Sequence, residues 1–284
     1  MMTDLVCPCS PDTPLVWSGK LPRCSRCGSF FDPAMAAQEI QYDGAYNAAR
    51  GHFDAALARL KLRSFQDWLH RTRLDQSIGI TVACEVGFGG AVCLEWLNYA
   101  ASRAFGIEAS VDAVARAETM GLPAGNLFIA DALPARLPEP VGLWIFQDSF
   151  EHLPDPEAFC RWLVDNSTAE ARVLIICPQA NSPSERLLGS WWPHRLPDHP
   201  FHWSRPGLGV FLGRFGFVVE RRFMPWKRVS PRLLLSHLAL KSGWALPKLG
   251  WLDRLAFPFN LGEMGLVLRR SSDMSPGAPP EDRP

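Results

Sequence analysis

The feature that most constrains this chain is a regular alternation of strand-like and helix-like runs that begins near residue 77. Apolar segments such as "GITVACEV" and "VGLWIFQD" alternate with longer segments such as "AVCLEWLNYAASRA" and "DPEAFCRWLVDNS". This alternation predicts an α/β fold with a doubly wound, mainly parallel sheet. Ligands of such sheets bind beyond the carboxyl ends of the strands, so the residues that follow each strand are the first candidates for a site.

A glycine-rich turn, "EVGFGG", follows the first of these strands at residues 85–90. Glycines between a strand and a helix indicate that the backbone comes close to a ligand. A P-loop is excluded, because no Gly-Lys-Ser/Thr follows. A dinucleotide fingerprint fits Gly87 and Gly89 but finds Val92 in its last place. Glu85, just before the turn, suits a ligand with an ammonium and a sulfonium group better than a pyrophosphate.

Two further acids end later strands. Glu108 closes the second strand, where a carboxylate can bind ribose hydroxyls, and Asp131 closes "NLFIAD", where it can accept a hydrogen bond from an adenine amino group. Each acid alone is typical of a solvated loop. Three acids at successive strand ends beside a glycine turn indicate one binding site.

The order of "EVGFGG", "GIEAS", "FIADA", "FQDSFEHLPDP" and "RVLIICPQ" resembles the class I S-adenosylmethionine-dependent methyltransferases, in their small-molecule branch, over residues 77–270. The resemblance implies a seven-stranded Rossmann-like sheet and S-adenosylmethionine as cofactor. The residues that it implies for cofactor binding are Glu85, Gly87, Gly89, Glu108, Asp131, Ala132 and Gln147. One departure is that the third glycine of the usual loop falls at Ala91, with Gly90 one place early.

The stretch "FQDSFEHLPDPEAF" carries the candidate chemistry. It is similar to a pattern in ubiquinone-biosynthesis O-methyltransferases, which implies a divalent metal at Asp148, Glu151 and His152, with Asp in the place of the first acid. His152 is alternatively a general base, since a near-neutral pKa lets an imidazole take a hydroxyl proton. A third reading is that Glu151 and His152 only cap and orient the following helix.

An aromatic and proline-rich stretch, "DHPFHWS", resembles the family segment that closes over the methyl acceptor. By that resemblance His202 is a third catalytic candidate, and His199 is the weaker match. The competing reading is that the tryptophans of this region simply pack a loop.

Four cysteines near the N-terminus have metal-ligand spacing: Cys7, Cys9, Cys24 and Cys27. Two close pairs joined by a hairpin-length loop predict a structural zinc ribbon over residues 1–33, in preference to unpaired thiols or a redox pair. The segment is too short to fold on a core of its own, so the metal would stabilise it. Four protein ligands leave no open position, and we therefore expect no catalysis there.

The remaining segments frame this core. Residues 34–76 predict two helices that link the ribbon to the sheet or form a lid over the cofactor. Residues 180–209 and 224–260 are expected to form substrate-side and cap segments. The second of these is basic and apolar, and it is also a candidate homodimer or carrier-protein surface. The tail, residues 271–284, is rich in proline and polar residues and is expected to be disordered.

Composition narrows the functional classes. Lys and Arg number 29 and so do Asp and Glu, so no global basic field would attract nucleic acid. No secretory signal and no membrane-spanning run is apparent, and the eight cysteines are expected to be reduced thiols, so we expect a cytoplasmic protein.

These observations predict an S-adenosylmethionine-dependent methyltransferase that acts on a small-molecule acceptor, at oxygen, in biosynthetic or secondary metabolism. One alternative is a ribosomal-RNA methyltransferase that uses the zinc module, with Lys20, Arg23 and Arg26, to bind RNA. A second alternative is a non-catalytic scaffold that keeps the fold.

Overall fold

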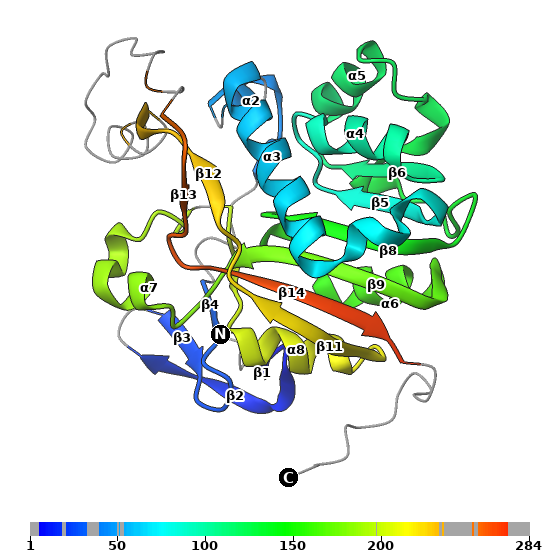
Figure 1. Ribbon diagram of the computed structural model, residues 1–284. Helices are drawn as coiled ribbons and strands as arrows, with labels where there is room; N and C mark the ends of the chain where they lie inside the picture. The colour runs from blue at the N-terminus through cyan, green and yellow to red at the C-terminus, as the bar shows by residue number, and fades with distance from the viewer. Residues whose placement is uncertain are drawn as a thin grey trace.

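The computed structural model describes residues 6–18, 21–32, 40–49, 51, 54–196, 198–232, 235, 252 and 255–271. Figure 1 shows a central twisted sheet with helices on both sides and a small β-module, in blue, below it. Among the helices of these ranges, none is both long enough and apolar enough to cross a membrane. The predicted tail from residue 272 and most of the predicted cap between residues 233 and 254 lie outside the described residues.

The main sheet has seven strands in the order β11-β14-β9-β8-β5-β6-β7. In chain order they are β5 (Val82–Val86), β6 (Arg103–Glu108), β7 (Leu127–Ile129), β8 (Val141–Gln147), β9 (Ser167–Pro178), β11 (Phe217–Phe223) and β14 (Glu263–Arg270). All pairs from β7 to β9 are parallel, whereas β14 runs antiparallel to both of its neighbours. The predicted doubly wound, mainly parallel sheet is confirmed. Its strand order reverses between β5 and β8, where such sheets bind ligands.

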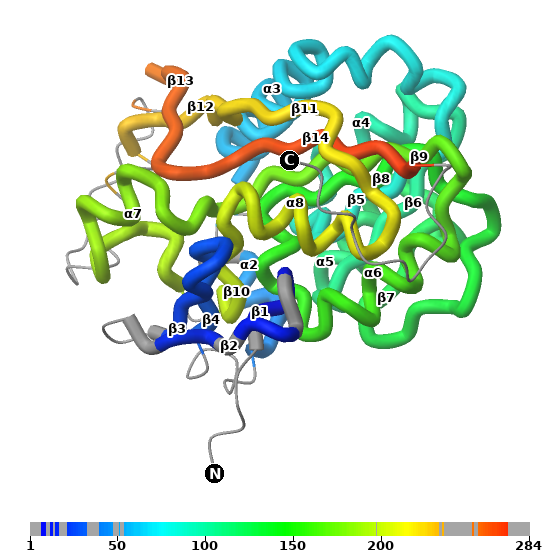
Figure 2. The backbone as a smooth tube through the Cα atoms, turned by 90° about the horizontal axis from the view of Figure 1, so that it is seen from below, coloured from blue at the N-terminus to red at the C-terminus, as the bar shows by residue number. Residues whose placement is uncertain are grey.

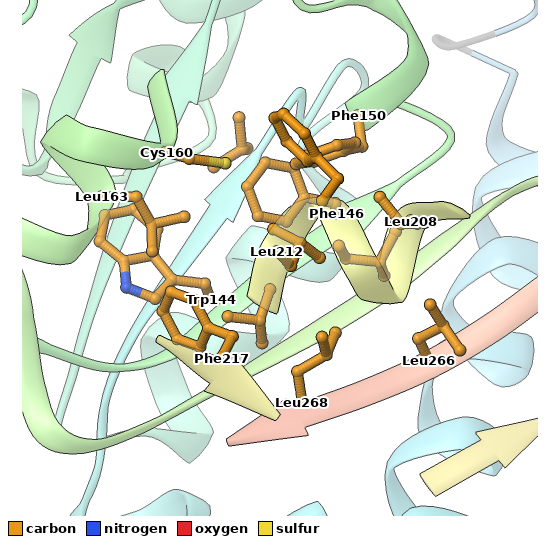
Figure 3. Packing of buried hydrophobic residues seen from close by; sticks show 14 of the residues in the cluster. Trp144, Phe146, Phe150, Cys160, Leu163, Leu208, Leu212, Phe217, Leu266 and Leu268 are labelled. Atoms are coloured by element: carbon orange, nitrogen blue, oxygen red, sulfur yellow. The ribbon is translucent and has the colours of Figure 1, made fainter. Parts of the chain in front are cut away.

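Helices cover the two faces of the sheet in a pattern that the strand sequences dictate. Along β8, Leu143 and Ile145 pack with one core cluster and Trp144 and Phe146 with the other, because successive strand residues point to opposite faces. The first cluster also includes side chains of α3 (Ala55–Thr72), α4 (Val92–Ala100) and α5 (Val111–Thr119). The second includes those of α6 (Pro156–Asp165) and α8 (Arg205–Gly213), as Figure 3 shows.

Two strand boundaries differ from the sequence-based expectation. The first strand was expected from Gly79, but Leu74–Ile80 form a 3-10 helix and the strand begins only at Val82. Thr81 ends this helix, since its hydroxyl donates to the Ser77 carbonyl oxygen at 2.6 Å. The third strand ends at Ile129, and Asp131 lies in the 3-10 turn that follows.

The N-terminal ribbon shares a sheet with a distant part of the chain. Its strands are β1 (Val6–Cys7), β2 (Ser10–Ser18), β3 (Leu21–Cys24) and β4 (Phe30–Phe31), and the fifth strand of this sheet is β10 (Phe201–His202). Figure 2 shows β4 and β10 beside each other. Arg23 extends the junction, because its guanidinium donates to Asn181 and to Glu185 at 3.2 Å. The ribbon is therefore built into the main domain.

Two short helices and one strand pair lie outside the main sheet and the helices that cover it. Helix α2 (Gly44–Ala49) precedes α3, and helix α7 (Pro183–Leu188) follows β9. Strands β12 (Lys227–Val229) and β13 (Phe257–Phe259) pair at the two ends of the predicted cap segment.

Ser204 joins the ribbon to α8. Its hydroxyl donates to the Cys27 carbonyl oxygen at 2.5 Å and accepts from the Gly207 N–H at the start of α8. The Ser204 N–H donates to the Ser29 hydroxyl at 2.9 Å. One buried side chain therefore caps a helix and holds the cysteine-bearing turn.

Ser204→Ala should lower the free energy of unfolding by about 2 kcal/mol, since it removes a helix cap and buried hydrogen bonds. It should also make the ribbon more sensitive to limited proteolysis. The matched control is Ser110→Ala, which removes the buried N-cap of α5, away from the ribbon. The control should lose stability without exposing the ribbon, and equal ribbon cleavage in both variants would contradict the proposed junction.

Candidate cofactor and acceptor site

A cavity of about 810 Å³ opens at the carboxyl ends of the parallel strands. Its wall comes from the turn after β5, the end of β6, the loop after β8 and the start of α6. Helix α2, ribbon strand β4 and strand β10 close the other side. The cavity lies at the switch point of the sheet, where the fold itself predicts a ligand.

The glycine turn brings bare backbone to this cavity. Gly87 has a φ of 74°, and a Cβ on it would lie 2.5 Å from the Ser149 Cβ. Any larger residue would therefore both strain the turn and collide with the loop after β8. Ala91 begins α4 with a φ of 59°, the left-handed conformation that glycine adopts without strain. This explains the departure from the family pattern, because Ala91 occupies the third glycine's place with a glycine-like backbone.

Glu108 fastens the turn to the neighbouring strand. One carboxylate oxygen accepts from the Gly89 N–H at 2.7 Å, and the other accepts from the N–H groups of Ala109 and Ser110 at 2.8 and 3.0 Å. The side chain lines the cavity. Glu108 therefore presents an oriented carboxylate to any ligand that lies on the glycine turn.

Glu85 and Gln147 form a buried polar pair beneath the turn. Gln147 donates its amide N–H to Glu85 at 3.0 Å, and the Lys61 ammonium lies 4.0 Å from the same carboxylate oxygen. Burial raises the pKa of Glu85 to about 7, while Lys61 opposes that rise and Glu108 adds to it. The second Glu85 oxygen and the Gln147 carbonyl oxygen have no donor among the described residues. Neither side chain lines the cavity, so the pair lies behind the turn and supports it.

The two remaining cofactor candidates lie at the rim. Asp131 lines the cavity from the turn after β7 and is exposed, so its carboxylate is open to a ligand. Ala132 is also exposed but does not line the cavity wall. The structure thus brings Gly87, Gly89, Glu108 and Asp131 to one cavity.

The opposite end of the cavity is aromatic and polar. Tyr46 of α2 donates its hydroxyl to Asp198 at 2.5 Å, and the His152 Nδ1 lies 3.7 Å from the same carboxylate oxygen. Phe31 of the ribbon and Phe201 of β10 contact each other there, with ring centroids 5.1 Å apart. This end can hold a planar acceptor and handle a proton.

Sequence reasoning missed Asp198 and Tyr46. The two lie far apart in the chain and meet only in the fold. Tyr42 and Tyr46 gave a partial signal, since they stand four residues apart in the sequence, and their rings contact at 5.0 Å. Asp198 precedes the histidine of "DHPFHWS" and carried no separate signal.

His202 does not reach this cavity. It is buried in β10, its ring stacks on Phe30 with centroids 4.2 Å apart, and it lines a separate small hollow. Burial lowers the pKa of His202 to about 3, and neither ring nitrogen has a hydrogen-bond partner among the described residues. The structure therefore gives His202 a packing environment. Two of the loop tryptophans, Trp192 and Trp203, are buried and pack the loop, whereas Trp191 is exposed.

The side chains that converge in the structure differ by one residue from the metal-binding group expected from the sequence. Glu151, His152 and His199 bring ligand atoms within 4.8 Å of one another. Asp148, the expected first acid, instead receives the Lys227 ammonium on both oxygens, at 2.8 and 2.6 Å. His199 takes its place in the cluster although it lies far along the chain.

The helix-capping alternative for Glu151 and His152 is not what the structure shows. The cap of α6 is Asp155, whose carboxylate accepts from the Ala158 N–H at 2.9 Å. Glu151 is only 1% exposed. Burial and the nearby Asp148 raise the pKa of Glu151 well above its usual range.

The N-terminal cysteines converge. The sulfur atoms of Cys7, Cys24 and Cys27 lie within 4.8 Å of one another. Cys9 is buried beside them, with its sulfur 3.8 Å from the Ser29 hydroxyl. Backbone N–H groups point at two of the sulfurs, from Cys27 to Cys24 and from Ser29 to Cys27, both at 3.4 Å. The cluster is compatible with the predicted zinc site, because thiolate sulfurs are donors that Zn²⁺ prefers.

Comparison with known proteins supports the fold. No family model matches the chain, and no curated protein matches it. A proposed methyltransferase from Bacillus halodurans superposes with a TM-score of 0.51 at 14% identity, covering 72% of this chain and 98% of that one. A chain of the Haloferax volcanii complex between the Trm112 methyltransferase activator and a proposed methyltransferase gives 0.50 at 14% identity, covering 78% and 96%.

A further solved structure, the magnesium protoporphyrin IX methyltransferase of Synechocystis PCC 6803 with bound S-adenosylhomocysteine, gives a TM-score of 0.48 at 17% identity. It covers 83% of this chain and 91% of that chain. At these identities the two superpositions with TM-scores of 0.50 and 0.51 establish the fold alone, a Rossmann-like α/β sheet that this chain shares with those structures.

The raised pKa of Glu85 predicts a pH-dependent cost to folding. Its pKa rises from 4.5 to about 7 in the folded state, so between these values the folded protein keeps a proton that the unfolded chain releases. Wild-type stability should therefore fall by up to ~3 kcal/mol as pH rises through this window. In denaturant titrations Glu85→Gln should lack this fall, and its stability relative to wild type should increase from pH 5 to pH 8. A difference independent of pH would contradict the assignment.

Proposed function

We propose that this protein is a cytoplasmic methyltransferase that transfers a methyl group from S-adenosylmethionine to an oxygen of a small-molecule acceptor. One observation carries the proposal. A single cavity of about 810 Å³ joins the glycine turn and the Glu108 carboxylate to a separate polar end at Tyr46, His152 and Asp198. A methyltransferase must bind its cofactor and its acceptor next to each other, and this cavity offers two chemically different regions for them.

The residues at the first end suit the charges of the cofactor. The glycine turn would hold the methionine portion, with the buried Glu85 carboxylate and Gln147 amide beneath it. Glu108 would bind the ribose hydroxyls and Asp131 the adenine amino group. These roles follow the family resemblance, and the convergence of Gly87, Gly89, Glu108 and Asp131 on one cavity supports the roles of those four residues.

Helix α2 would act as a lid across both ends. Asn47 donates to the Ser110 hydroxyl at 2.8 Å beside the predicted ribose site, and Tyr46 donates to Asp198 at the acceptor end. Both residues line the cavity. Holding the reactants together and excluding water is most of what methyl transfer requires.

Methyl transfer to a hydroxyl group requires that the acceptor oxygen, the methyl carbon and the sulfur lie in line and that the hydroxyl proton is removed. The acceptor oxygen forms a bond to the methyl carbon while the carbon–sulfur bond breaks, and its electron pair stays on sulfur. The cofactor supplies the activated methyl group. The hydroxyl proton would pass to Asp198, which accepts a hydrogen bond from Tyr46, or to His152, whose Nδ1 lies 3.7 Å from the same carboxylate; all three residues line the cavity.

The ribbon would contribute to the acceptor end. A structural zinc ion held by Cys7, Cys9, Cys24 and Cys27 would stabilise the turn before β4, and β4 carries Phe31 into the cavity wall. Of the basic residues behind the RNA alternative, Arg23 is engaged with Gly28, Asn181 and Glu185, whereas Arg26 is exposed. Lys20 lies outside the described residues.

Calorimetric titration of zinc-replete protein with S-adenosylhomocysteine tests the proposal. Glu108→Ala should weaken binding at least ten-fold, since it removes hydrogen bonds to a charged group worth about 1.5–3 kcal/mol. Its matched control is Glu118→Ala, an exposed acid of α5 that should bind as wild type does. Absence of binding by folded wild-type protein would leave the scaffold alternative.

Gly87→Ala should abolish measurable binding in the same assay, because the added Cβ has no room and the backbone conformation is strained. Gly125→Ala is its control, since nothing lies within 4 Å of a Cβ at that position. Normal binding by Gly87→Ala would show that the turn is not the cofactor site.

A further inference from the structure

The cluster of Glu151, His152 and His199 beside the cavity has the properties of a metal site. Its donors are one carboxylate and two imidazoles, with ligand atoms within 4.8 Å of one another. His152 also lines the cavity, so an ion at this position would touch the acceptor end.

The burial of Glu151 is independent evidence for a bound cation. Its side chain is 1% exposed, and neither carboxylate oxygen has a hydrogen-bond partner among the described residues. A buried polar group without a partner is costly, and a buried carboxylate is normally paired or bound to a metal. Lys227, the basic residue that could reach this region, is already bonded to Asp148 and Glu263.

One of the two histidines, His199, is held in the way metal-binding histidines are. The His199 Nδ1 lies 2.8 Å from the His194 carbonyl oxygen, so the Nε2 is the nitrogen that would bind a metal. Ligating imidazoles almost always carry such a carbonyl or a carboxylate on the second nitrogen. For His152 the nearest carboxylate is Asp198, 3.7 Å from the Nδ1, and Asp198 accepts a hydrogen bond from Tyr46.

We infer that Glu151, His152 and His199 bind a divalent first-row transition-metal ion at the acceptor end of the cavity. Two imidazoles favour ions from manganese to zinc over magnesium, which prefers oxygen ligands alone. Three protein ligands leave open positions, so the ion can also bind oxygen atoms of the acceptor. The inference rests on the proposed function for that last role only.

The ion would select and activate the acceptor. An acceptor with two neighbouring oxygen atoms could chelate it, and the positive charge would lower the pKa of the hydroxyl to be methylated. The released proton would then pass to Asp198 and Tyr46. This assigns His152 to metal binding and leaves proton transfer to its neighbours.

Manganese binding by zinc-replete protein tests the site, because the electron paramagnetic resonance signal of free Mn²⁺ falls as the ion binds. Wild type should bind one equivalent, which Mg²⁺ displaces poorly. Glu151→Gln, His152→Gln and His199→Gln should each weaken binding at least about ten-fold. Asp148→Asn should bind Mn²⁺ as wild type does, since Asp148 is outside the cluster.

The same samples are titrated with S-adenosylhomocysteine, which separates this inference from the proposed function. Normal nucleoside binding in all of these variants shows that they are folded. Nucleoside binding with no bound Mn²⁺ would overturn the metal site and leave the proposed function intact. Mn²⁺ binding that depends on Asp148 but not on His199 would also overturn it, whereas Mn²⁺ binding without nucleoside binding would keep the site and remove the proposed function.

Discussion

The pairing of β4 with β10 is the interaction on which the acceptor end of this structure depends. Only two residues of each strand take part, Phe30 and Phe31 with His202 and Phe201. The pairing is nevertheless fixed on both sides, by the cysteine turn before β4 and by the Ser204 cap after β10. Because side chains alternate along a strand, one register places Phe31 and Phe201 at the cavity and turns Phe30 and His202 away from it.

This junction also explains why a thirty-residue cysteine module accompanies the sheet. Such a segment cannot bury enough apolar surface to fold alone, and its thiols supply the missing stability if they hold a metal. The last strand of the ribbon, β4, pairs with β10 and so supports the preceding segment that carries Asp198 and His199. The ribbon then acts as a structural wall of the site, and a long-range partner surface is not needed to account for it.

The sequence predicted those features of the fold and of the site that depend on local patterns of residues. Alternating runs gave the parallel sheet, and short motifs after the strands gave Gly87, Gly89, Glu108 and Asp131, which the structure gathers at one cavity. These residues could be found because strand ends share one edge of a parallel sheet. The convergence of Cys7, Cys24 and Cys27 could be predicted because two close cysteine pairs joined by a short loop are a typical spacing of metal-binding thiolates.

The remaining features depend on contacts between distant segments, which a single sequence does not display. The pattern around Glu151 pointed to Asp148 as its companion, but Lys227 from beyond residue 220 binds that acid and His199 joins the cluster instead. His202 resembled the acceptor histidine, yet the register with β4 stacks it on Phe30. In both cases a strand register or an ion pair, and not the local motif, decided which side chain faces the cavity.

The central claim is that one cavity holds the cofactor on the glycine turn and leaves an acceptor site beside it. A crystal structure of the zinc-replete protein with S-adenosylhomocysteine tests this most directly. We expect the ribose hydroxyls on Glu108, the sulfur near Gly87 and open space between that sulfur and Tyr46, Asp198 and His152. A nucleoside bound elsewhere, or filling the acceptor end, would contradict the account.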